Sequence, residues 1–330
     1  MRSSSVNRPV AAAGRARTRA IEKALSAGGD TPDMIVAGSA SQSLAVALSA
    51  ATGRDLAAVS FEAFPDGEWK VNVGGSDADG GGGDADSPPE LAGEEVVVVA
   101  STVSDRAHVE LLQLQDAVRE AGASGVTTVI PYMGYARQNE AFLSGDPVSA
   151  RAVARAISTG TDRVVTVNPH EETVRDFFDV PATSVDAAPR LAEPLPDFDE
   201  PLFLAPDEGA VGLAETVRDA YGAGEIDYFE KHRSYDTGDV AVEPAGTEPA
   251  GRSVVLVDDI VATGSTMAAA IDQLHEQRVA GVYVTCLHPM FAANARSKLA
   301  AAGVDGVWGT DTVERPTSAV SVAPAIADYF

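Results

Sequence analysis

Short apolar segments alternate with longer amphipathic segments along most of this 330-residue chain. Residues 108–121 are typical of the second kind, because Leu111, Leu114 and Val118 recur at helical spacing. Apolar runs of four or five residues between such segments are typical of parallel strands that are covered by helices on both faces. We therefore predict an α/β fold. The predicted strands are residues 34–37, 96–100, 126–130, 164–167, 202–205, 254–257 and 282–286.

The strand–loop–helix plan occurs twice in similar form, which suggests duplicated domains. Residues 96–99 run into a polar loop and then a helix, and residues 254–257 do the same. We place the two domains at residues 34–182 and 183–330. Within the first, the segment 74–89 contains the run GGGGDADSPP and is too poor in apolar residues to pack, so we predict a solvated loop there.

The amino-terminal segment, residues 1–33, differs in composition from the rest of the chain. It is rich in arginine and poor in acid, and it lacks the apolar core of a secretory signal. A targeting peptide remains one interpretation of this composition. We favour a disordered basic extension or an over-extended start codon, with the folded part beginning at Met34.

The charge of the chain restricts its partners. Its 49 acidic residues face 24 basic ones, which gives a formal net charge of -25, and only four residues are lysines. Such a field repels nucleic-acid backbones and anionic membranes, so we predict neither as a partner. The same composition suits a protein kept soluble in molar salt, where screening shortens the reach of charge repulsion to about 3 Å. A salt-adapted source is a hypothesis from composition.

The cysteine and apolar content indicates the compartment. Cys286 is the only cysteine, so the chain cannot form an intramolecular disulfide. It also has no apolar run of the roughly 18 residues that would be needed to span a bilayer. We therefore predict a cytoplasmic protein that acts on small molecules.

The strongest chemical signal is the segment 254–266, VVLVDDIVATGST, in which a strand ends in two carboxylates before a loop of small hydroxylated residues and a helix. Gly264 lets the backbone approach a ligand, and the N–H groups of the loop and the helix start point at an anion. The carboxylates can accept hydrogen bonds from vicinal sugar hydroxyls or hold Mg²⁺. We therefore predict a ribose phosphate site at Asp258, Asp259, Ala262, Thr263, Gly264, Ser265 and Thr266.

The same segment also has a purely structural interpretation, a solvated strand end followed by an ordinary helix cap. The order of strand, acid pair and anion loop favours a ligand site, because α/β proteins bind ligands at that edge of the sheet. It is not a Walker loop, since the pattern GxxxxGK[ST] is absent.

The segment resembles the phosphoribosyl-binding motif shared by type I phosphoribosyltransferases and ribose-phosphate diphosphokinases. Residues 64–68 (FPDGE), 131–138 (PYMGYARQ), 147–151 (PVSAR) and 168–170 (NPH) resemble the diphosphokinases in sequence and in order. The resemblance extends from about Met34 to the C-terminus. It implies two similar type I phosphoribosyltransferase-like domains, each a mainly parallel sheet flanked by helices.

The resemblance also implies a reaction and an assembly. The diphosphoryl group of Mg-ATP would pass to the anomeric hydroxyl of ribose 5-phosphate, giving 5-phosphoribosyl 1-diphosphate and AMP for nucleotide biosynthesis. The protein would be a homo-oligomer with its ATP site near a subunit interface. By matching motif, ATP would be bound by Asp66, Gly67, Glu68, Arg137 and Gln138. Taken alone, Asp66 and Gly67 are typical of an ordinary turn, and Arg137 of a surface ion pair.

Two further pairs of residues acquire roles from the resemblance. His170 and Asp207 would bind the Mg²⁺ that accompanies ATP, although histidine is an uncommon magnesium ligand and a lone loop histidine is often structural. Lys231 and Arg233 would be the catalytic cations that stabilise the charge of the moving diphosphate, with Arg233 also contacting ribose 5-phosphate. Their spacing places both on one face of an extended segment. A solvated basic turn is the competing interpretation.

Three positions depart from the family pattern, and two other functions compete with the synthetase. Asn139 and the pair Asn168-Pro169 stand where the family usually has Asp and Asp-Leu, and the phosphate loop lacks the usual acidic residue.

One rival function is that of a nucleobase-salvage phosphoribosyltransferase, which would not need the N-terminal half. The other is a non-catalytic regulatory paralogue, in which Lys231, Arg233, His170 and Asp207 should have been lost.

Overall fold

The computed structural model describes residues 34–74, 91–233 and 240–330, and only the backbone of 231–233 and 240–243. The predicted extension 1–33 and nearly all of the predicted loop 74–89 lie outside the described residues. Within them, the α/β class is confirmed and every predicted strand is present, with ends that differ from the predicted ones by no more than three residues. The predicted helix 108–121 is α3 (Asp105–Glu120), which begins after the N-cap residue Ser104.

The first domain is built on a six-stranded sheet in which all neighbours are parallel. In sheet order, its strands are β2 (Asp55–Leu56), β1 (Met34–Ala37), β5 (Glu95–Val99), β6 (Gly125–Ile130), β7 (Arg163–Val167) and β8 (Ala182–Val185). A separate antiparallel hairpin, β3 (Val59–Ala63) and β4 (Trp69–Val73), packs on α3.

The second domain repeats this plan. Its sheet order is β11 (Val240–Pro244), β10 (Glu225–Arg233), β9 (Leu202–Ala205), β12 (Ser253–Ile260), β13 (Gly281–His288), β14 (Gly306–Thr310) and β15 (Ser318–Val320). Only β11 is antiparallel to its neighbour. When β11 and the hairpin are left out, the two sheets have the same strand order. In each, the second strand along the chain lies at the edge, the first lies beside it, and the others follow in chain order. This agreement supports the duplication suggested by the sequence.

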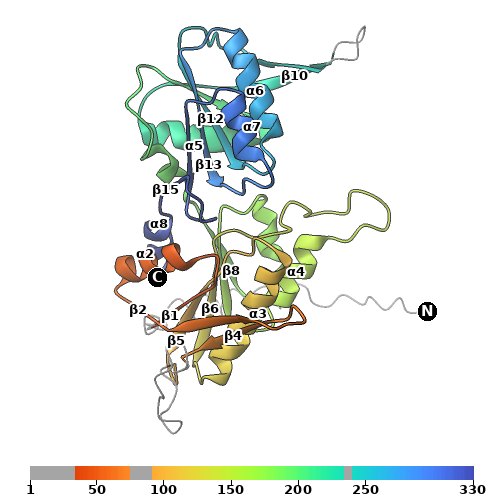
Figure 1. The fold of residues 1–330 in the computed structure, drawn as a ribbon, viewed down its shortest axis with the longest axis vertical. Coiled ribbons are helices and arrows are strands. Elements are labelled where there is room, and N and C mark those ends of the chain that lie inside the picture. Colours follow the sequence, from red (N-terminus) through yellow and green to blue (C-terminus); the bar gives the residue numbers. More distant parts are fainter. Residues whose placement is uncertain (1–33, 75–90, 234–239) are drawn as a thin grey trace, which may run out of the picture.

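Helices connect and cover the strands of both sheets (Figure 1). In the first domain they are α2 (Gln42–Thr52), α3, α4 (Ser149–Ile157) and the 3₁₀ turn η2 (Glu172–Phe177). In the remainder of the chain they are η3 (Ala188–Ala192), η4 (Glu208–Ala210), α5 (Val211–Tyr221), α6 (Ser265–Glu276), α7 (Ala295–Ala301) and α8 (Ala323–Ala327).

The inner strands of both sheets, such as β5 and β9, are mainly apolar, as expected for sheets that are buried on both faces. In β5, Val97 and Val99 belong to the core that runs between the two domains, whereas Val96 and Val98 belong to the core under α3 and α4. The apolar residues of β12 divide in the same way between the shared core and the core under α6. The two domains are thus joined by a continuous apolar interface.

The end of the chain strengthens this junction. Helix α8 packs against α2, so the C-terminus returns to the first domain (Figure 1). Nearby, one Glu314 carboxylate oxygen accepts hydrogen bonds from the N–H groups of Ser43 (2.6 Å) and Leu44 (3.0 Å) at the start of α2. The predicted division at 182/183 stays a prediction; the first sheet itself continues through β8 to Val185.

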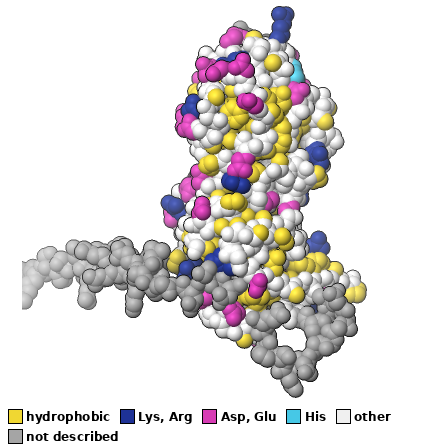
Figure 2. Space-filling model, turned by 90° about the vertical axis from the view of Figure 1, so that its left-hand side faces the viewer, with side chains coloured by type: hydrophobic (Ala, Val, Ile, Leu, Met, Phe, Trp, Pro, Cys, Tyr) yellow, Lys and Arg dark blue, Asp and Glu magenta, His cyan; other side chains and the backbone are white. Residues whose placement is uncertain are grey.

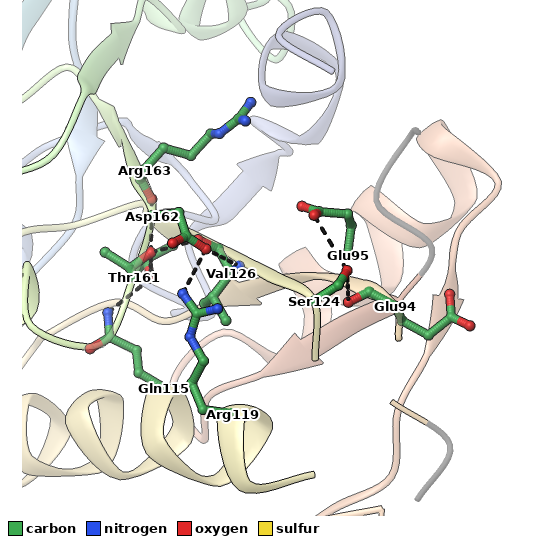
Figure 3. A network of polar contacts seen from close by, with 10 residues as sticks. Glu94, Glu95, Gln115, Arg119, Ser124, Val126, Thr161, Asp162 and Arg163 are labelled. Carbon is green, nitrogen blue, oxygen red and sulfur yellow. Dashed lines mark hydrogen bonds and ion pairs between the residues drawn. The ribbon is translucent and has the colours of Figure 1, made fainter. Parts of the chain in front are cut away.

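A polar network ties α3 to the strands of the first sheet at their amino ends (Figure 3). Asp162 accepts hydrogen bonds from Arg119 Nη2 (2.6 Å) and from the Val126 N–H (2.8 Å). The Thr161 hydroxyl bonds the Val126 carbonyl oxygen at 2.9 Å. Because ligands of parallel sheets bind at the carboxyl ends of strands, this network supports the fold rather than the site.

The surface agrees with the acidic composition. On the face drawn in Figure 2, acidic side chains gather over the upper part of the molecule, which is the second domain, while Lys and Arg side chains form separate spots. Among the helices that the structure describes, none has the length and apolarity required to cross a bilayer.

Candidate functional site at the carboxyl ends of the strands

The carboxylates predicted to bind ligand lie together at one edge of the second sheet. Asp258 and Asp259 are inside β12, which runs three residues beyond the predicted end at Val257. Asp207 follows the neighbouring strand β9 and caps η4, where its Oδ1 accepts a hydrogen bond from the Gly209 N–H at 3.1 Å. Since β9 and β12 are adjacent and parallel, their carboxyl ends bring the three carboxylates to one place.

His170 reaches this edge from the first domain. It follows β7, and its Nδ1 lies 2.6 Å from Asp259 Oδ2. Both side chains are partly exposed, at 37% for His170 and 28% for Asp259, so a ligand can reach them. The groups surround a cavity of about 420 Å³ between the domains. It is lined by Asn168, Pro169, His170, Glu171, Glu172, Asp207, Gly209, Ala210, Leu213, Asp258, Asp259 and Leu287.

The close packing of these groups shifts their pKa values. Burial, and then the charge of Asp259, raises the pKa of Asp258 far above its ordinary value. Burial also acts to raise the pKa of Asp259, but the hydrogen bond and charge of His170 outweigh it and hold that pKa below its ordinary value. The hydrogen bond to Asp259 raises the pKa of His170. The contact with His170 therefore favours the ionised form of Asp259, and the clustered carboxylates of Asp207, Asp258 and Asp259 favour a bound cation.

The loop that carries His170 is fixed by residues of both domains. Asn168 has a left-handed backbone (φ 35), and its amide oxygen accepts a hydrogen bond from the Ala187 N–H at 2.7 Å. Its carbonyl oxygen lies 3.0 Å from Nε2 of His288, a fully buried residue on β13. Burial lowers the pKa of His288, so its neutral ring donates from Nε2 to this carbonyl. Asn168, which departs from the family pattern, thus has a structural function here.

Arg137 and Gln138 lie beside a second cavity, of about 450 Å³, at the start of α3. Its lining residues are Thr102, Val103, Ser104, Asp105, Tyr132, Gly134, Tyr135, Arg137, Gln138, Phe142 and Met290. Tyr132 lines this cavity, and its ring centroid is 5.2 Å from that of His288 in an edge-on contact. Burial raises the pKa of Tyr132. The Gln138 amide oxygen accepts a hydrogen bond from the Ser149 hydroxyl. This bond fixes the Gln138 side chain, which is consistent with the predicted role of Gln138 in supporting Arg137.

The turn Asp66, Gly67 and Glu68 joins β3 to β4 and lines neither cavity. It is exposed, with Gly67 at φ 94 and the Glu68 N–H donating to Asp66 Oδ1 at 3.1 Å. The structure of one chain therefore does not bring this turn to Arg137. Its assignment to ATP stays a prediction, one that requires the turn of a neighbouring subunit.

The predicted phosphate loop, residues 262–266, follows β12 and leads into α6. Gly264 is at φ 70, and a Cβ there would lie 3.2 Å from the Cα, Cβ and carbonyl oxygen of Ala295. Both the backbone angle and the space thus require glycine. The Ala262 carbonyl oxygen accepts a hydrogen bond from the Ala292 N–H at 2.9 Å, so the chain after β13 supports the loop. The side chains of Thr263, Ser265 and Thr266 are exposed, and a ligand can reach them.

Lys231 and Arg233 are within β10, so the segment is extended as predicted and is not a turn. Their backbones pair with Val242 and Val240 of β11, and alternate positions of a strand share a face. Their side chains, and all of residues 234–239, lie outside the described residues. Sequence reasoning did not single out Lys298, whose Nζ donates to Ser265 Oγ at 2.7 Å. The only sequence signal was the scarcity of lysine.

The carboxylates at the first cavity are of the chemical type that holds a divalent cation. Among the described residues, no three His, Cys, Asp or Glu side chains converge as a ready-made metal site. Mg²⁺ commonly binds through one or two carboxylates and substrate phosphates, with water completing its shell. The carboxylates at the cavity, whose mutual repulsion a cation would relieve, fit that mode of binding.

Comparisons with known proteins agree with this architecture. Residues 34–160 match the family model for the N-terminal domain of ribose phosphate pyrophosphokinase, and residues 191–313 match the phosphoribosyl transferase domain. The crystal structure of phosphoribosylpyrophosphate synthetase from Mycobacterium smegmatis has a TM-score of 0.73 with 26% identity, and covers 90% of this chain and 96% of that one.

Closer relatives are archaeal. The ribose-phosphate pyrophosphokinase of Halobacterium salinarum is 58% identical over 89% of this chain and 99% of its own length. That of Methanosarcina mazei is 42% identical over 89% of this chain and 94% of its own. Pyrophosphokinase and diphosphokinase are two names for one activity. The chain therefore belongs to the ribose-phosphate pyrophosphokinase family.

Proposed function

We propose that the chain makes 5-phosphoribosyl 1-diphosphate by transferring the diphosphoryl group of ATP to ribose 5-phosphate, as the name of its archaeal relatives implies. The observation that carries the proposal is the meeting of the two domains. His170 of the first is bonded to Asp259 of the second, at the strand edge from which the anion loop starts. A nucleotide on one side and a sugar phosphate on the other would meet there.

The sugar phosphate is assigned to the second domain. Backbone N–H groups at the start of α6 and the hydroxyls of Thr263, Ser265 and Thr266 bind the 5-phosphate. Asp258 and Asp259 accept hydrogen bonds from the ribose hydroxyls. Holding the substrate at both ends fixes its anomeric carbon in the cavity, which lowers the entropic cost of the reaction.

ATP is assigned to the first domain, with help from a neighbouring subunit. The Arg137 guanidinium stacks on adenine or binds phosphate oxygens, and Gln138 supports it. Asp66, Gly67 and Glu68 come from the partner in a homo-oligomer. Mg²⁺, held by His170 and Asp207, neutralises phosphate charge when it is bound.

The transfer itself needs positioning and charge stabilisation rather than a covalent intermediate. The anomeric hydroxyl loses its proton, and its oxygen forms a bond to the β-phosphorus. The bond from that phosphorus to the oxygen that links it to the α-phosphorus breaks, AMP leaves with that oxygen, and the proton of the anomeric hydroxyl passes to water. Lys231 and Arg233 stabilise the charge that develops on the moving group. The enzyme works in the cytoplasm of a salt-adapted cell.

A release assay separates this function from both rivals. With Mg²⁺ and high KCl, the purified chain should release AMP from ATP only when ribose 5-phosphate is present. A salvage phosphoribosyltransferase would instead release diphosphate from 5-phosphoribosyl 1-diphosphate and a nucleobase. A regulatory paralogue would turn over neither pair of substrates at any salt concentration. Either of the last two results would refute the proposal.

A further inference from the structure

The phosphate loop is packed directly against α7. Gly264 leaves no room between the loop and Ala295, the first residue of that helix. Two backbone hydrogen bonds of 2.9 Å, from Phe291 N–H to the Val261 carbonyl and from Ala292 N–H to the Ala262 carbonyl, hold the segment that precedes α7 against the loop. The position of α7 relative to the loop is therefore well fixed.

Lys298 lies on the side of α7 that faces the loop. It follows Ala295 by three residues, and residues three apart on a helix are neighbours on its surface. Its side chain is half-buried, and Nζ is 2.7 Å from Oγ of Ser265, the first residue of α6. An ammonium group thus lies at the start of the helix that we assign to the 5-phosphate.

This contact fixes the direction of the Ser265 hydroxyl. An ammonium can only donate hydrogen bonds, so Ser265 Oγ accepts from Lys298. The hydroxyl hydrogen of Ser265 is then free to donate to another acceptor. A phosphate oxygen at the start of α6 is such an acceptor, because backbone N–H groups converge on it there.

The charges around the loop point to an anion as well. The start of a helix carries a partial positive charge, which disfavours a cation unless an anion is also present. Lys298 is one of four lysines in a chain with a net charge of -25. The last turn of α7 favours a cation at position 298, but that effect does not require contact with Ser265.

From these contacts we infer that Lys298 is a positioning residue of the sugar-phosphate site, which orients Ser265 and adds positive charge beside the 5-phosphate. The inference rests on the proposed function and extends it to a residue outside the loop motif. It assigns to Lys298 a part in binding the phosphate monoester and none in the transfer step.

The test is steady-state kinetics with ribose 5-phosphate varied at saturating Mg-ATP and constant KCl. Lys298→Met should raise the KM for ribose 5-phosphate about tenfold, as expected for the loss of one charged hydrogen bond. Its kcat and its KM for ATP should stay within about twofold of wild type, and Lys298→Arg should restore most of the affinity. The control Arg296→Ala removes the same charge from an exposed position of α7 and should change neither constant.

Calorimetric titration with ribose 5-phosphate, without ATP, gives a second readout that needs no turnover. The Kd of Lys298→Met should rise by the same factor as its KM. If wild type releases AMP while Lys298→Met keeps its KM and Kd within about twofold, or loses kcat instead, the inference is overturned and the function stands. If wild type itself shows no AMP release, the proposed function fails first.

Discussion

Lys231→Ala is expected to fold normally and to lose at least about a hundredfold in kcat, the scale for removal of a group that stabilises transition-state charge. Lys231 and Arg233 occupy alternate positions at the end of β10, a strand adjacent to β9, whose carboxyl end leads to Asp207. A cation at that edge would act on the moving diphosphate more strongly than on bound ATP. The effect should therefore appear in kcat rather than in the KM for ATP.

The control for Lys231→Ala is Arg296→Ala, which removes the same charge from the surface of the same domain. Circular dichroism should show equal secondary structure in both variants and wild type. A kcat for Lys231→Ala within about threefold of wild type would reject the catalytic role, since that difference is less than 1 kcal/mol.

Asp259→Asn is expected to lower kcat/KM for ribose 5-phosphate by about a hundredfold, the upper range for the loss of hydrogen bonds to a charged group. Asparagine keeps the shape of the side chain and can still bond His170. The substitution removes the negative charge of the carboxylate. That carboxylate contacts His170 and, in our proposal, accepts hydrogen bonds from the ribose hydroxyls. Activity with ribose 5-phosphate varied, in high KCl with Mg²⁺, measures the loss.

Asp272→Asn is the matched control for this variant. Asp272 is an exposed residue of α6, and the substitution makes the same change of charge without touching either cavity. Its kcat/KM should equal that of wild type within about twofold. If the two variants behave alike, Asp259 has no special part in the site.

Apolar runs were sufficient for the class and for the seven strands predicted from them, because strands buried on both faces are rich in apolar residues. The hairpin and the strands toward the sheet edges, β2, β8, β10, β11, β14 and β15, contain no such run and were not predicted. The prediction also failed where polar residues continue a strand. Asp258 and Ile260 pair in register with Cys286 and His288 of β13, so β12 extends past Val257, the last residue of the predicted apolar run. Lys231 and Arg233 were predicted only as part of an extended segment, whereas pairing with β11 includes them in β10.

The site was predicted where its residues are close in sequence and missed where they are distant. The loop 262–266 carries its own pattern of glycine and hydroxyls. Lys298 meets Ser265 only because α7 packs on the loop, and His288 meets the Asn168 carbonyl across the domain junction. Contacts of that separation leave no local pattern. The turn at Asp66 shows a further limit, since its predicted contact with ATP requires a neighbouring subunit, and such a contact cannot be seen in one chain.

The central claim is that a diphosphoryl group, and not a single phosphoryl group, moves from ATP to ribose 5-phosphate. Phosphorus NMR of the wild-type reaction in Mg²⁺ and high KCl tests it most directly. ATP resonances should be replaced, in equal amounts, by those of AMP and of a diphosphate attached to the anomeric carbon. Formation of ADP with a singly phosphorylated anomeric carbon would contradict the claim.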